Sequence, residues 1–159
     1  MSLPYHTNLS ATQQANAGIT HPAPLAYADR VHHDELDALM HVNNVRYFVW
    51  FERLRIRFME THNIGTIGDR DSPRIVIRGG EARYVKEMLR DEDYIVTTRC
   101  SEFRNTSLTL VQEIWAHGTL RATFTCVMVL LKPDGDGRQP ISDRIKSQLK
   151  QADGAVQHG

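Results

Sequence analysis

The chain has 159 residues, of which 41% are hydrophobic and 24% are charged, a balance typical of one folded domain rather than a disordered segment. Its 19 basic and 19 acidic residues cancel, so we expect no nucleic-acid partner, which would need a large basic excess. No apolar run of about 18 residues and no apolar signal core occur, which predicts no membrane association. Two cysteines, Cys100 and Cys126, at no metal-like spacing favour the cytoplasm.

The predicted elements begin after residues 1–24, which carry no periodic pattern and indicate an extension that is mobile or draped over the domain. Residues 25–33 favour a strand, and residues 44–62 carry the strongest helical pattern of the chain. Four segments dense in β-branched and aromatic residues then predict strands: 74–86, 93–102, 107–116 and 120–131. A surface helix follows at 142–151, with Ser142 as its N-cap, which closes a domain of residues 25–151. Residues 152–159 are expected to form a frayed tail.

One strand, one long helix and four further strands indicate an α+β fold. The short connections predict an antiparallel meander for the last four strands, within an antiparallel five-stranded sheet wrapped around one long central helix. On a helical wheel only a narrow stripe is polar: Arg46, Arg53, Arg57 and Glu60. A curled sheet or a second copy of the chain would cover the remaining, apolar surface of this helix. Glu52 and Arg55 lie three residues apart inside the apolar arc, so we expect them to pair, unless one of them lines a site.

Reactive side chains are concentrated between the first strand and the long helix, where three acids, one histidine and two asparagines fall within residues 34–44. Asn43 or Asn44 suits a helix N-cap, and the unpaired N–H groups that follow could stabilise an oxyanion. Asp37 could act as a nucleophile or as a base for water, and His41 could orient it or move a proton. Alternatively, Asp37 is a turn residue, His41 packs before the cap, and the asparagines are caps alone.

This segment resembles the active-site segment of hot-dog-fold thioesterases, the superfamily that includes 4-hydroxybenzoyl-CoA thioesterase and its acyl-CoA relatives. Their pattern is Asp-x-Asp-x-x-Gly-His-Val-Asn-Asn-x-x-Tyr, followed by a helix with Glu and Arg. The matching residues here are Asp37, His41, Val42, Asn43, Asn44, Tyr47, Glu52 and Arg55, and the resemblance spans residues 25–132. Glu35 replaces the first Asp, and Met40 stands where a glycine usually permits a tight turn. The segment is also similar to that of plant acyl-carrier-protein thioesterases, although Leu39 occupies their Asn position.

The resemblance implies a hot-dog fold that hydrolyses an acyl thioester, most readily an acyl-CoA, to free acid and thiol. It makes Asp37 the nucleophile or general base, gives His41 a catalytic role, and makes the helix N-terminal amides the oxyanion hole. It assigns substrate binding to Val42, Asn43, Asn44 and Tyr47. It implies no metal and no cofactor, coenzyme A entering only with the substrate, and a homodimer or homotetramer with its sites at subunit interfaces.

Three alternatives remain open: hydrolysis of an acyl-carrier-protein thioester, a hydratase or dehydratase, and a non-catalytic protein that binds acyl-CoA. The retained Asp37 argues against a pure binder, and the His and acid arrangement of the hydratases is not found. Arg83, Lys86 and Arg90 are candidates for the coenzyme A phosphates, although isolated basic side chains are more often simply solvated. Gly79-Gly80 indicates a bulge or a close approach of the backbone to a ligand.

Overall fold

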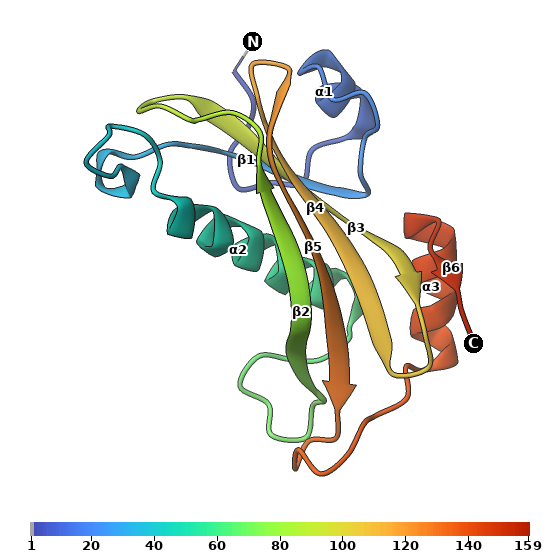
Figure 1. Cartoon of the computed structure of the whole chain (residues 1–159). Helices are drawn as coiled ribbons and strands as arrows, with labels where there is room; N and C mark the ends of the chain where they lie inside the picture. The colour runs from blue at the N-terminus through green and yellow to red at the C-terminus, as the bar shows by residue number, and fades with distance from the viewer. Residues whose placement is uncertain (1) are drawn as a thin grey trace.

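Six β-strands form one sheet that curls around the long helix α2 in the computed structural model, which describes residues 2–159. The helical elements are α1 (Ala11–Asn16), the short 3₁₀ turn η1 (His33–Glu35), α2 (Asn44–His62) and α3 (Asp143–Asp153). The strands are β1 (Leu25–Arg30), β2 (Arg74–Tyr84), β3 (Asp93–Phe103), β4 (Ser107–Ala116), β5 (Thr119–Leu131) and β6 (Val156–Gln157). Figure 1 shows α2 lying against the sheet, with α3 and β6 beyond its C-terminal end. No helix within residues 2–159 is long and apolar enough to cross a membrane.

The strand order is β1-β3-β4-β5-β2, with β6 added in parallel beside the end of β3. The predicted meander of four strands is therefore wrong for β2, which pairs with β5 instead of β3. Strand β3 has no free edge for β2, because β1 and β4 flank it on both sides. The chain between β2 and β3 instead crosses the end of the sheet, and this crossing brings it to the N-terminal end of α2.

The ends of α2 agree with the sequence prediction because both depend on local signals. The side chain of Asn43 caps the N-terminus by accepting the Val45 N–H at 3.1 Å. Asn63 ends the helix in the left-handed conformation, with φ of 49°. Arg144 of α3 donates to the carbonyl oxygens of His62 and Asn63 at 3.3 and 3.1 Å. Both termini of α2 are therefore satisfied and fixed.

The predicted pair between Glu52 and Arg55 does not form. Arg55 turns into the core, where its Nη1 donates to Gln112 Oε1 at 3.0 Å and its guanidinium lies 5.5 Å from the centre of the Phe124 ring. Burial lowers the pKa of Arg55. Glu52 stays exposed, because water solvates a carboxylate more cheaply than the interior does.

The N-terminal extension lies draped over the edge of β1 and the outer face of the sheet. Leu9 and Ile19 are buried there against Ala26, Ala28 and Ile95. Gln14 is fully buried, and its side-chain amide bonds the backbone of Leu9 and Ala23. Figure 1 shows α1 close to the turn that joins β4 and β5. The extension thus packs as part of the folded chain.

Several element boundaries differ from the predicted ones; the second strand, for example, ends at Tyr84 rather than at residue 86. Strand β1 stops at Arg30, because residues 33–35 turn into η1. The C-terminal tail is not frayed: α3 runs to Asp153, and β6 adds a sixth strand where β1 leaves the end of β3 uncovered. The Asp153 carboxylate is buried, accepting the Cys100 N–H at 2.7 Å and lying 3.1 Å from His62 Nε2. These contacts hold the last helix in place.

We expect Gly18→Ala to destabilise the fold more than Gly68→Ala. Both glycines have positive φ, 91° and 82°, so an alanine is strained at either position. A Cβ on Gly18 would also meet the Cα of Gly118 at 2.6 Å, whereas no atom lies within 4 Å of one on Gly68. Urea unfolding should show a loss of about 2–4 kcal/mol for the first variant and about 1 kcal/mol for the second. Equal losses would mean that the extension does not pack against the β4–β5 turn.

Candidate active site

The segment before α2 folds into a tight turn around Asp37. Its N–H donates to the His41 carbonyl oxygen at 2.8 Å, and the Met40 N–H donates to the Asp37 carbonyl oxygen at 3.0 Å. Asp37 Oδ1 accepts the Leu39 N–H at 2.9 Å, so Asp37 does form the turn that the alternative interpretation predicted. This uses one carboxylate oxygen, and Oδ2 has no hydrogen bond within residues 2–159. Asp37 can therefore stabilise the turn through Oδ1 and still have Oδ2 available for a reaction.

Met40 occupies the left-handed region, with φ of 62°. This conformation costs a residue with a Cβ about 1–2 kcal/mol, which explains why a glycine is expected there. The methionine thus adopts the backbone conformation expected of a glycine, at the cost of backbone strain. Its side chain and that of Leu39 are exposed, so the tip of the turn presents an apolar surface to solvent.

Among the N–H groups at the start of α2, from Asn43 to Arg46, only one has no hydrogen-bond acceptor within residues 2–159. The Asn43 N–H donates to the Glu35 carbonyl oxygen at 2.8 Å, and the Val45 N–H donates to the Asn43 side chain. The Arg46 N–H donates to the Asn43 carbonyl oxygen at 2.8 Å. The Asn44 N–H remains, at the positive end of the helix dipole. It is thus the candidate donor to an anionic oxygen.

The opposite wall comes from the end of β2 and the residues after it, of which the sequence interpretation had proposed only the basic side chains, as phosphate ligands. The Tyr84 hydroxyl donates to the Asn44 carbonyl oxygen at 3.0 Å, and its ring packs edge-on against Tyr47 at 5.2 Å between centroids. The Val42 N–H donates to the Met88 carbonyl oxygen at 2.9 Å. Burial raises the pKa of Tyr47 to about 12 and also raises the pKa of Tyr84. Both phenols are therefore protonated at neutral pH.

A shallow pocket of about 280 Å³ lies between these two walls. It is lined by Asp37, His41, Val42, Asn44, Tyr47, Tyr84, Val85, Lys86 and Glu87. Five of the six predicted site residues thus meet at one pocket, while Asn43 lies behind it as the helix cap. In the described chain the His41 ring has no hydrogen bond, and its link to Asp37 runs through the backbone alone. Val85 and Glu87 carry no local sequence signal, because only the path of β2 brings them here.

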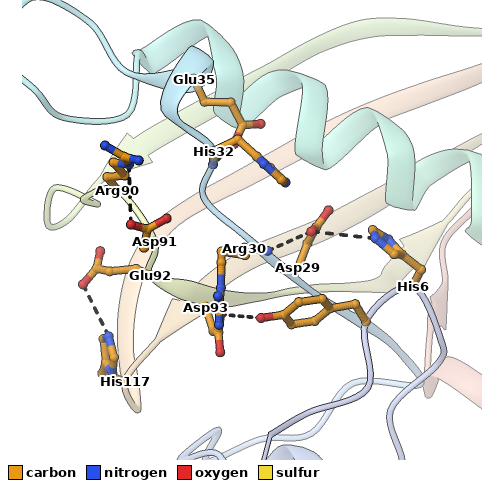
Figure 2. A network of polar contacts seen from close by, with 11 residues as sticks. His6, Asp29, Arg30, His32, Glu35, Arg90, Asp91, Glu92, Asp93 and His117 are labelled. Atoms are coloured by element: carbon orange, nitrogen blue, oxygen red, sulfur yellow. Dashed lines mark hydrogen bonds and ion pairs between the residues drawn. The ribbon is translucent and has the colours of Figure 1, made fainter.

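A buried arginine holds the β2–β3 connection in place. Arg121 donates to the Glu87 carbonyl oxygen at 2.7 Å and pairs with the Glu92 carboxylate at 3.2 Å. Its own carbonyl oxygen accepts the N–H groups of Val85 and Lys86. Figure 2 shows Glu92 also facing His117, 3.5 Å away. This wall of the pocket is therefore fixed by charge as well as by backbone bonds.

Of the three basic candidates for a phosphate, only Lys86 lines the pocket, and the described part of the chain gives it no ion pair. Arg83 pairs with Glu81, and Arg90 lies 3.5 Å from Asp91. Among residues 2–159, no three His, Cys, Asp or Glu side chains are grouped so as to hold a metal ion.

Exposed large apolar side chains also occur on α2, on β2 and on the chain after β2. They are Val45, Phe48, Val76, Ile77, Tyr84, Val85 and Leu89. Strand β2 pairs with β5 on one side only, so its outer edge is unpaired within the described residues. The predicted bulge at Gly79-Gly80 is confirmed, because the register shifts between Ile77 and Gly79. A Cβ on Gly80 would meet the Phe124 side chain at 2.7 Å, so the strand packs closely on the core here. Strand β2 thus combines an unpaired edge with exposed apolar side chains.

We expect Met40→Gly to stabilise the protein. Glycine relieves the left-handed strain but adds freedom to the unfolded chain, which leaves a net gain of about 0.5–1 kcal/mol. Leu39→Gly, at the neighbouring exposed position without positive φ, should instead cost about 0.5–1 kcal/mol. Urea unfolding of both variants measures the difference. A loss of stability in Met40→Gly would contradict the strained conformation.

Similarity to known proteins covers most of the chain. Residues 31–149 match the thioesterase-like superfamily. A search of curated proteins found no match. The structure of a thioesterase superfamily protein from Jannaschia sp. CCS1 is 36% identical, with a TM-score of 0.92, over 99% of this chain and 100% of that one. A thioesterase from Bacillus stearothermophilus, described as predicted, is 30% identical with a TM-score of 0.69, over 84% and 99%.

A third similar structure is that of a thioesterase from Thermus thermophilus, complexed with coenzyme A and Zn. It is 25% identical, with a TM-score of 0.69, over 83% of this chain and 96% of that one. The sheet wrapped around α2 is the hot-dog fold that these proteins share. The chain therefore belongs to the thioesterase-like superfamily, through a match that includes the whole segment from Val31 to the end of α2.

Proposed function

We propose that the protein hydrolyses acyl-CoA thioesters to a free acid and coenzyme A. The observation that carries this proposal is that the free oxygen of the Asp37 carboxylate and the free Asn44 N–H belong to residues lining one pocket. Thioester hydrolysis needs such a pair, a nucleophile or base beside a donor for the oxyanion. Membership of the thioesterase-like superfamily supports the same reaction.

In the proposed reaction the Asn44 N–H donates to the thioester carbonyl oxygen, which becomes an oxyanion when the carbonyl carbon is attacked. Asp37 either attacks that carbon, forming a mixed anhydride that water then hydrolyses, or takes a proton from the attacking water. In both routes the carbon–sulfur bond breaks and the thiolate leaves with its electron pair. His41, whose ring has no hydrogen bond in residues 2–159, supplies a proton to that sulfur. One oriented donor to the oxyanion lowers the activation free energy by about 3–4 kcal/mol.

Three observations support acyl-CoA as the substrate class. Lys86 places an unpaired cation on the pocket lining, where it suits a phosphate of coenzyme A. The similar Thermus thermophilus protein was solved with coenzyme A. Tyr84 and Val85, which are exposed and line the pocket, suit the apolar part of an acyl group. An acyl-carrier-protein thioester is the second candidate, since it presents the same reacting group.

We further propose that two copies of the chain associate through β2. The edge of β2 is long, unpaired within residues 2–159 and flanked by exposed apolar side chains of α2, such as Phe48. A two-fold axis would pair this strand with its copy in antiparallel fashion and would cover that surface. The shallow pocket beside it would then be completed by the second subunit. Further assembly of dimers into a tetramer is compatible with this arrangement.

We expect Asp37→Asn to lower kcat by at least about 100-fold, because the variant can neither attack the carbonyl carbon nor accept a proton. The assay is free-thiol release from acyl-CoAs with short, long, branched and aromatic acyl groups. Asp34→Asn is the matched control, an exposed acid three residues earlier whose carboxylate has no bond within residues 2–159. It should keep wild-type turnover.

Three outcomes would contradict parts of this proposal. Unchanged turnover in Asp37→Asn would remove that residue from the reaction. Hydration of crotonyl-CoA without thiol release would indicate a hydratase. Tight binding of acyl-CoA without turnover, together with no turnover of acyl-carrier protein, would indicate a ligand-binding protein.

We expect Val76→Lys, on the exposed edge strand β2, to convert the dimer to a monomer and to lower turnover by about 10-fold or more, because it places a charge in the interface. Val156→Lys is the control, since Val156 is also an exposed strand valine but lies on β6. Sedimentation velocity of both variants provides the readout. A wild-type protein that sediments as a monomer at micromolar concentration would contradict the β2 interface.

A further inference from the structure

A buried carboxylate lies behind the candidate site without lining it. Glu35 is 7% exposed, and each of its oxygens accepts one hydrogen bond. Oε1 accepts the Trp50 indole N–H at 2.8 Å, and Oε2 accepts the His32 backbone N–H at 2.8 Å. Figure 2 shows Glu35 and His32 together at the start of the turn. Because burial of an unpaired carboxylate is costly, these two bonds are what allow Glu35 to lie there.

The backbone of the same residue adds a third bond. The Glu35 carbonyl oxygen accepts the N–H of Asn43, the residue that caps α2. Glu35 therefore ties the beginning of the turn, at His32, to its end, at Asn43. Through Trp50 it ties both to the second turn of α2.

The anchor point on α2 is itself rigid. Trp50 is 1% exposed and stacks on Tyr94 of β3, with ring centroids 4.1 Å apart and planes 20° apart. Tyr47, which lines the pocket, also packs against Trp50, with its ring centroid 5.3 Å away. A side chain held in this way cannot follow the turn if the turn moves.

The two proposed reacting groups lie on either side of this anchor. Asp37 follows Glu35 by two residues, and Asn44 follows Asn43 by one. We propose that Glu35 is a positioning residue, which sets the Asp37 carboxylate against the Asn44 N–H through Trp50 and Asn43. This inference rests on the proposed thioesterase function. It explains why a charged side chain is buried beside the pocket and yet does not reach it.

The chemistry of the two donors makes a carboxylate necessary. Both partners of the side chain are N–H groups, so both oxygens must accept. In Glu35→Gln the amide offers one acceptor, and its NH₂ faces an N–H, so one bond is lost. A shift of the turn by about 1 Å would cost up to about 100-fold in rate without changing which groups touch the substrate.

The test compares Glu35→Gln and Trp50→Phe with Glu113→Gln. Glu113 Oε2 accepts the Trp115 indole N–H at 2.8 Å on β4, away from the pocket, and no other donor bonds this side chain in the described residues. The control therefore makes the same Glu→Gln change at a carboxylate where the amide oxygen can keep its single bond. Two readouts are taken on the full-length protein well below each melting temperature: amide hydrogen exchange of residues 36–44, and kcat and KM with an acyl-CoA that the wild type turns over.

We expect exchange over residues 36–44 to rise about 10-fold or more in Glu35→Gln and Trp50→Phe, and to be unchanged in Glu113→Gln. We expect kcat to fall by about 10–100-fold in both variants while KM stays within about twofold, because contacts to the substrate are kept. The double variant should be no worse than the worse single variant, since the two side chains are proposed to act through the bond that joins them.

Unchanged exchange in both variants would overturn the inference, as would a kcat within about twofold of wild type. Additive losses in the double variant would show that the two residues act separately. The exchange readout needs no substrate. If the wild-type protein turned over no thioester, the proposed function would be refuted. If exchange still rose in the variants, the anchoring role of Glu35 would nevertheless stand.

Discussion

The burial of one face of α2 against the sheet fixes everything that the candidate site requires. Trp50, Phe51, Leu54 and Phe58 are almost fully buried, and each such side chain contributes about 1.5–3 kcal/mol relative to exposure. Their sum is comparable with the whole net stability of a small domain, so the helix cannot shift without unfolding it. The N-terminus of α2 is consequently a fixed point, and Asn44, at its first position, lines the pocket.

Two further segments beside that fixed point are held by polar bonds to the body of the fold. The turn around Asp37 is held through Glu35, and the β2–β3 connection is held through Arg121 and the Val42 N–H. The turn also carries the strained backbone of Met40, a cost of about 1–2 kcal/mol that such bonds offset. Stability and the proposed chemistry thus depend on different parts of the fold. The core supplies the stability, and the hydrogen-bonded turn and connection hold the candidate residues in position.

The sequence predicted those features that depend on neighbouring residues. The limits of α2, its cap at Asn43 and the cap of α3 at Ser142 all follow from periodicity and local hydrogen bonding. The pairing of β2 with β5 could not be inferred in this way, because it depends on which edge of β3 is already taken. Tyr84, Val85 and Glu87 were missed at the site for the same reason. The Glu52–Arg55 pair failed because Gln112, distant in sequence, offers Arg55 an acceptor inside the core.

The most direct test of the proposed chemistry is a crystal structure with an acyl-CoA analogue in which a methylene group replaces the thioester sulfur, so that the bond cannot be cleaved. We predict that the analogue's carbonyl oxygen accepts the Asn44 N–H at about 2.7–3.1 Å. We also predict that the Asp37 carboxylate faces the carbonyl carbon, directly or through one water. A carbonyl group bound away from the N-terminus of α2, with Asp37 facing solvent, would contradict this chemistry.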